Sequence, residues 1–114
     1  MALTRTFRDT VKARADSDPE FRAALLKEAV DLMLAGDLAT GKAVLRDYIN
    51  ATIGFTELAA EVGKPSKSLM RMFSKEGNPR HNNLTAVFGQ LQAQEGVRIG
   101  ITLRRNPKPT RKSA

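Results

Sequence analysis

The sequence predicts a mainly α fold: a small bundle of five to six helices, followed by one C-terminal β-strand and a disordered basic tail. Three observations lead to this prediction. Apolar residues recur at helical spacings of three and four between residues 3 and 91. Beyond Gly96 they alternate with polar residues, as in a half-buried strand. Finally, 41% of the residues are hydrophobic but only six are aromatic, so the core must consist mostly of aliphatic side chains on helices.

The N-terminal part of the chain predicts two helices separated by a break at residues 16–19. The first helix, over residues 1–15, has apolar side chains every four residues: Leu3, Phe7, Val11 and Ala15. Asp18 is expected to cap the second helix and Pro19 to open it. That helix runs to about Ala35, and its broad apolar face predicts a central position. The face comprises Phe21, Leu25, Leu26, Ala29, Val30, Leu32, Met33 and Leu34.

A third helix is expected after Gly36. Gly36 ends the second helix and Asp37 caps the next one, which ends before Gly54. The residues predicted to be buried on it are Leu38, Leu45, Tyr48, Ile49 and Ile53.

Residues 55–73 predict two short helices joined at Gly63. Each carries one apolar stripe, made of Leu58, Ala59 and Val62 on the first helix and of Leu69, Met72 and Phe73 on the second. Ala59 is small enough for a close helix crossing, and Gly63 stands where a left-handed backbone is commonly needed. This pattern is typical of a helix-turn-helix of the phage-repressor type, whose second helix enters the DNA major groove.

The second of these helices has the side chains that DNA contact requires. No carboxylate occurs between Gly63 and Lys75, and phosphate groups disfavour nearby carboxylates. We expect contacts with base edges from Ser66, Lys67, Ser68 and Arg71. The alternative is an ordinary antiparallel helix pair that serves only to pack a small bundle.

A turn-rich loop over residues 74–82 follows, and Asn83 is expected to cap a further helix that carries Leu84, Val87, Phe88 and Leu91. Polar and basic residues in and around this region predict contacts with DNA phosphates, to which a helix N-terminus adds backbone N–H groups. The predicted phosphate contacts are Thr56, Lys64, Lys75, Arg80, His81, Asn82 and Asn83. Residues 77–79 are interpreted as a structural turn, with a phosphate cradle as the alternative.

The predicted strand covers residues 97–104, where Val97, Ile99, Ile101 and Leu103 alternate with polar residues and glycine. A single strand cannot satisfy its own backbone groups and must pair. We predict that it pairs with a second copy and that these four apolar residues form a dimer interface. Packing on the chain's own helices and pairing with the sheet of another protein remain open. Residues 106–114 have no periodicity and predict a disordered basic tail.

The net charge of +7 is unevenly distributed. Residues 1–53 hold eight Lys and Arg against eight Asp and Glu, whereas residues 94–114 hold six against one. The basic half is therefore where we expect a polyanion to dock. The length of 114 residues without an internal linker predicts one domain over residues 1–105, with N-terminal helices over 1–53 and a DNA-contacting part over 54–92.

Composition also argues against several classes of function. There is no cysteine, and His81 is the single histidine, so a disulfide framework, a transition-metal site, another cofactor and catalysis are not expected. No apolar run is long enough to span a bilayer, and the first residues lack a signal-peptide pattern. The expectation is a non-enzymatic cytoplasmic protein without membrane contact.

Residues 61–79, with the loop pattern Ser74-x-Glu76-Gly77-Asn78-Pro79, and residues 83–88 behind them resemble the HigA-like antitoxins, also called addiction-module antidote proteins. The lead-in at residues 18–25 and 36–38 matches as well, so that the resemblance covers roughly residues 16–92. Pro65 and Met70 depart from the family pattern, which often has a small polar residue and an aromatic residue there, and the C-terminal part is longer than usual.

The resemblance implies a dimeric transcriptional repressor that binds double-stranded operator DNA. It also implies a type II antitoxin that neutralises a messenger-RNA-cleaving toxin encoded beside it. A stand-alone phage or mobile-element regulator without a toxin is one alternative, and a helical structural or adaptor protein that does not bind DNA is another.

Overall fold

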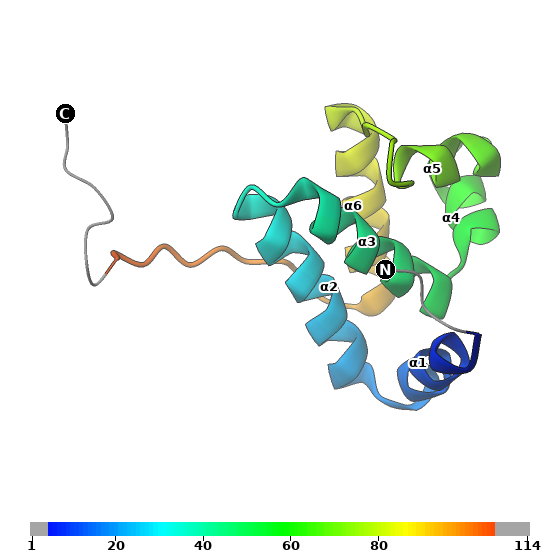
Figure 1. Cartoon of the computed structure of the whole chain (residues 1–114), viewed down its shortest axis with the longest axis horizontal. Helices are drawn as coiled ribbons and strands as arrows, with labels where there is room; N and C mark the ends of the chain where they lie inside the picture. Colours follow the sequence, from blue (N-terminus) through cyan, green and yellow to red (C-terminus); the bar gives the residue numbers. More distant parts are fainter. Residues whose placement is uncertain (1–4, 107–114) are drawn as a thin grey trace.

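The computed structural model describes residues 5–106, with side chains from Asp9 onward. Within this range the chain forms a compact globule of six α-helices (Figure 1). The helices are α1 (Arg5–Ser17), α2 (Pro19–Leu34), α3 (Leu38–Ala51), α4 (Phe55–Val62), α5 (Ser66–Met72) and α6 (His81–Glu95). The predicted helical class and number of helices are therefore confirmed. No helix of the described part is long and apolar enough to cross a membrane.

The two predicted aspartate caps are present. Asp18 accepts a hydrogen bond from the backbone N–H of Phe21 at 3.1 Å, directly before Pro19 in the first turn of α2. Asp37 accepts one from the backbone N–H of Thr40 at 3.2 Å. Each bond satisfies a backbone donor that the first turn of a helix leaves unpaired.

The α2–α3 hairpin is the largest helix contact of the molecule, and a glycine makes it close. A Cβ atom on Gly41 would lie 2.6 Å from the Met33 side chain and 3.1 Å from the Ala29 carbonyl oxygen. Gly41 therefore allows the backbones of α2 and α3 to approach more closely than a larger residue would.

The core lies where the α2–α3 hairpin meets α4, α5 and α6. Its buried side chains come from all five of these helices: Leu26, Ala29, Leu45, Tyr48, Ile49, Phe55, Leu58, Ala59, Leu69, Phe73, Val87 and Leu91. Two residues predicted to be buried are not: Leu34 is 62% exposed and Leu38 is 39% exposed. Both lie at the α2–α3 turn, which the other helices of the described chain do not cover.

The prediction of a β-strand over residues 97–104 is wrong for the single chain. These residues are extended but have no strand assignment, and the segment leaves the globule beside α2 (Figure 1). A strand needs a neighbouring backbone to pair with, and residues 5–106 supply none. Exposure rises along the segment, from half-buried Ile99 to 68% at Ile101 and 91% at Leu103. The predicted basic tail lies outside the described residues from residue 107 onward.

Candidate nucleic-acid interface

Helices α4 and α5 pack together through a turn centred on Gly63. Gly63 ends α4 in the left-handed conformation, with φ 71°, which residues with a Cβ atom adopt only with strain. The backbone N–H of Lys64 donates back to the Ala59 carbonyl oxygen at 3.0 Å. Ala59 is 2% exposed, and Leu58 and Leu69 are fully buried. The predicted apolar stripes therefore face the core, and the opposite side of α5 is left at the surface.

The exposed face of α5 carries two cations. Lys67 and Arg71 are exposed and stand four residues apart, so they lie on the same side of the helix. Ser66 and Ser68 are half-buried at the two edges of this face. Met70 is 51% exposed between them, and the predicted set of base contacts omitted it. Its helical position, three residues after Lys67, was the available signal.

Two cations of α3, neither of them predicted from the sequence, hold the C-terminal end of α5. Lys42 is only 4% exposed. Its Nζ donates to the carbonyl oxygens of Ser74 at 2.9 Å, Lys75 at 3.4 Å and Gly77 at 2.5 Å. Arg46 Nη1 donates to the Phe73 carbonyl oxygen at 2.6 Å. The end of a helix leaves such carbonyls unpaired and is stabilised by positive charge, so these bonds fix α5 to α3.

The loop after α5 folds back against the helix because residue 77 is glycine. A Cβ atom there would lie 1.9 Å from the Arg71 carbonyl oxygen and 2.5 Å from that of Met72. The Gly77 N–H donates to the Ser74 carbonyl oxygen at 3.1 Å, and Ser74 Oγ donates to Arg71 O at 2.7 Å. The interpretation of residues 77–79 as a structural turn agrees with this geometry.

The predicted phosphate contacts lie at the surface, with one correction. Helix α6 begins at His81, with Arg80 in the N-cap position, so Asn83 belongs to its first turn and does not cap it. The side chain of Arg80 forms no capping bond. Lys75 in the loop and Arg80, His81 and Asn82 around the start of α6 are all exposed, and the loop lies beside α5 (Figure 1).

Comparison with protein-family models, with curated proteins and with solved structures gives no match to this chain. We therefore infer its function from the arrangement of its residues.

The predicted dimer residues lie away from α5. The segment after α6 leaves beside α2, whereas α4 and α5 lie on the other side of the globule (Figure 1). Val97, Ile99, Ile101 and Leu103 are thus separate from the basic surface.

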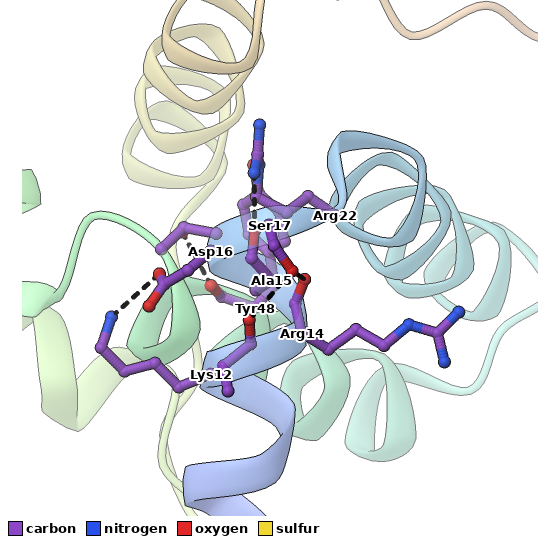
Figure 2. Close-up of polar contacts among 9 residues, drawn as sticks. Lys12, Arg14, Ala15, Asp16, Ser17, Arg22 and Tyr48 are labelled. Atoms are coloured by element: carbon purple, nitrogen blue, oxygen red, sulfur yellow. Dashed lines mark hydrogen bonds and ion pairs between the residues drawn. The ribbon is translucent and has the colours of Figure 1, made fainter.

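A buried polar network fixes the point from which this segment departs. The Glu95 side chain, 3% exposed at the end of α6, accepts from the Tyr48 hydroxyl at 2.6 Å and from Arg22 Nε at 2.9 Å. Arg22 Nη1 also donates to the Ala15 carbonyl oxygen at 2.6 Å (Figure 2). Burial, reinforced by the hydrogen bond to Glu95, raises the pKa of the Tyr48 hydroxyl well above its ordinary value.

No group of three or more His, Asp or Glu side chains in the described part of the chain is placed to hold a metal ion.

Proposed function

We propose that this protein is a sequence-specific DNA-binding transcriptional repressor. In it, α4 and α5 form a helix-turn-helix, and α5 is the recognition helix that enters the major groove. One observation carries the proposal: the exposed face of α5 presents Lys67 and Arg71 and no carboxylate, while its other face is fixed in the core through Leu69. A rigid helix with an acid-free cationic face suits the negatively charged groove of DNA.

The exposed face of α5 divides into base and flanking contacts. Arg71 is long enough to donate two hydrogen bonds to a guanine, and Lys67 lies beside it one turn earlier. Ser66 and Ser68, at the edges, donate to bases or to the adjoining phosphates. Met70 adds an apolar contact, for example with a thymine methyl group.

Phosphate contacts then come from the residues that flank α5. Lys64 stands in the turn before it, and Lys75 and Arg80 lie in the loop after it. His81 and Asn82 open α6, whose first N–H groups favour an anion. The buried bonds of Lys42 and Arg46 support this role, since they hold the loop and α5 in one fixed arrangement.

The repressor acts as a homodimer, with Val97, Ile99, Ile101 and Leu103 in its interface. A single recognition helix contacts few base pairs, and two-fold symmetric half-sites give the selectivity that a repressor needs. Its biological role is that of a type II antitoxin that represses its own operon and neutralises a messenger-RNA-cleaving toxin. The support for the toxin is the family resemblance of residues 16–92.

Titration of the protein against its own upstream DNA in a mobility-shift assay tests the DNA-binding function. We expect selective binding, and Arg71→Ala should lose about 1–3 kcal/mol at one base position and relax the preference there. Lys12→Ala is the control, because it removes one positive charge from an exposed side chain of α1, outside both proposed surfaces. Equal affinity of the unmodified protein for unrelated DNA, or unchanged selectivity of the Arg71 variant, would contradict the proposal.

A further inference from the structure

The extended segment after α6 has a backbone that is almost free of partners. Among the bonds its N–H groups make are Val97 N–H to the Gln92 carbonyl oxygen at 3.1 Å and Ile99 N–H to Gln92 Oε1 at 2.7 Å. Residues 97–106 belong to no strand. The segment thus presents an open edge, and beyond half-buried Ile99 its apolar side chains become more exposed, at Ile101 and then at Leu103.

This segment and α2 enclose an apolar groove of about 1030 Å³. Leu26, Val30 and Leu34 contribute to the α2 wall, and Leu34 is 62% exposed. Ile99 packs against the core, so the side of the segment that carries the odd-numbered residues faces the globule. Apolar surface on both walls, beside an open backbone edge, indicates an interface.

We propose that this groove is occupied by the same segment of a second copy. Residues 97–103 of the two copies pair as antiparallel strands, with the two-fold axis at Gly100. The proposal deepens the proposed function, since it names the register and the α2 surface of the repressor dimer. It also leaves both α5 helices uncovered, because the segment departs on the other side of the globule (Figure 1).

Charge and side-chain pattern select this register over its neighbours. With Gly100 on the axis, Val97 lies opposite Leu103, Ile99 opposite Ile101 and Arg98 opposite Thr102. Apolar residues then meet on one face, and like charges are not placed opposite each other.

The neighbouring registers pair the side chains less favourably. An axis at Ile101 places Arg98 opposite Arg104 twice, and like charges directly opposite one another are destabilising. An axis at Ile99 places Leu103 opposite Glu95, which belongs to α6 and is not available for pairing. An axis between two residues pairs the apolar face with the polar one.

In the selected register the partner strand fills the groove. Its apolar side chains lie on the same face of the two-stranded ribbon as Ile99, which is the face turned toward the globule. The exposed surfaces of Ile101, Leu103 and Leu34 are thereby removed from water. Both copies gain the same contacts, as a two-fold interface requires.

Single cysteines test the register, because the chain has none of its own. Opposite Cα atoms in an antiparallel pair lie about 4.5–5.5 Å apart, within the range of a disulfide. A Cβ atom on Gly100 meets nothing within 4 Å, so Gly100→Cys leaves the fold intact. We expect this variant to form a covalent dimer on mild oxidation in dilute solution.

Thr102→Cys is the matched control. In the proposed register Thr102 lies roughly 13 Å from its mate, four residues of strand away, and should not cross-link. An equimolar mixture of Arg98→Cys and Thr102→Cys should give only the mixed covalent dimer. Failure of Gly100→Cys to cross-link, or cross-linking of Thr102→Cys with itself, overturns the register.

Sedimentation of the unmodified chain and of two variants tests whether the α2 side of the groove contributes to the dimer. Leu34→Lys should raise the dimer dissociation constant roughly tenfold or more, because Leu34 lines the groove. Leu38→Lys, at the same end of the α2–α3 hairpin but outside the groove, should change it little. An unmodified chain that sediments as a monomer, or equal effects of the two variants, overturns the proposal.

These outcomes are separable from the failure of DNA binding. A dimer with the Gly100 cross-link that binds no DNA contradicts the repressor and leaves the interface standing. A monomer that binds its operator selectively contradicts the interface alone.

Discussion

Lys42 and Arg46 of α3 bond to backbone carbonyl oxygens at and after the end of α5. A lysine is rarely buried without partners, and Lys42 finds three carbonyl oxygens in the loop after α5. Arg46 bonds to the carbonyl oxygen of Phe73 at the end of that helix. Neither residue needs to touch DNA to matter, because both determine where α5 lies relative to α3.

Replacement of the buried cation provides the first residue-scale prediction. Lys42→Met keeps a long side chain but removes the donor from three carbonyl oxygens. We expect it to lower the free energy of unfolding by about 1–3 kcal/mol in urea titrations. It should also weaken binding to all DNA sequences alike. Lys12→Met, on an α1 side chain that is 55% exposed, is the control and should stay within about 0.5 kcal/mol. A Lys42 variant as stable as this control would contradict the structural role of the bonds.

Alanine substitutions at two glycines, Gly77 and Gly89, should change stability in opposite directions. Gly77→Ala places a Cβ atom 1.9 Å from the Arg71 carbonyl oxygen, so the loop must move and the protein should lose stability. Gly89→Ala lies inside α6 with nothing within 4 Å and should gain about 0.5–1 kcal/mol, because alanine loses less backbone entropy in a helix. Thermal unfolding of both variants measures the difference. Equal midpoints for the two would show that the loop does not need glycine.

At the scale of elements, caps determine where helices begin. Asp18 and Asp37 bond to backbone N–H groups in the first turns of α2 and α3, and both helices begin where the sequence predicts. Helix α6 has no side-chain cap, and its N-cap residue is Arg80, three residues before the predicted cap Asn83. The first turn of α6 therefore has N–H groups without a side-chain partner next to Arg80, which suits the proposed contact with phosphate.

The Asp18 cap predicts a pH dependence of stability. The hydrogen bond from Phe21 N–H, helped by Arg14, holds the pKa of Asp18 below its ordinary value of 3.8. Its charged form therefore contributes stability that is fully present above pH 3.8 and is lost as the pH falls through the lower pKa of the folded state. Asp18→Asn keeps a capping oxygen but does not titrate. The unmodified protein should melt higher than this variant at neutral pH, and the gap should shrink toward about pH 2. A constant gap would exclude the charge as its cause.

The cations around α5 predict a salt dependence. Lys75→Ala and Arg80→Ala should each weaken binding to all DNA sequences alike and flatten the slope of log affinity against log salt concentration by about one. Affinities measured at several salt concentrations give that slope. If one of these variants lost affinity for a single base change only, that residue would contact a base and not a phosphate.

At the scale of the whole molecule, the proposed DNA surface and the proposed dimer surface lie on different sides of one globule (Figure 1). The Tyr48–Glu95–Arg22 network anchors the end of α6 to α3 and α2, so the segment after it departs from a fixed point. In the proposed dimer, fixed positions of both surfaces would set a fixed distance between the two α5 helices.

This rigidity predicts sensitivity to operator spacing. Two half-sites should lie about one DNA turn, ~34 Å, or a multiple of it apart, so that both α5 helices meet the same side of the duplex. Insertion of about half a turn between the half-sites should reduce affinity to that of one half-site. Insertion of a full turn should restore part of the lost affinity only if the segments after α6 can bend to span the longer distance. Footprinting and mobility shifts on such operators measure this. Affinity that is independent of spacing would contradict a rigid dimer.

Local sequence patterns were enough to predict the helical class, the two aspartate caps, the turn at Gly63 and the buried stripes of α4 and α5. These features depend on neighbours within one or two helical turns, so periodicity and capping preferences suffice to predict them. The candidate surface of α5 was also predicted from the sequence, because exposed residues follow from the buried face of the same helix.

Tertiary structure alone decided the features that join distant parts of the chain. The partners of Lys42 lie more than thirty residues away, and those of Glu95 lie on α2 and α3. Exposure of Leu34 and Leu38 depends on what covers the α2–α3 turn. The spacing of apolar residues around them does not distinguish them from core residues. Residues 97–104 have the pattern of a strand, but a strand also needs a second backbone beside it, which the described chain does not provide. Local pattern determines what a segment can form, and only the assembled molecule determines whether its partner is there.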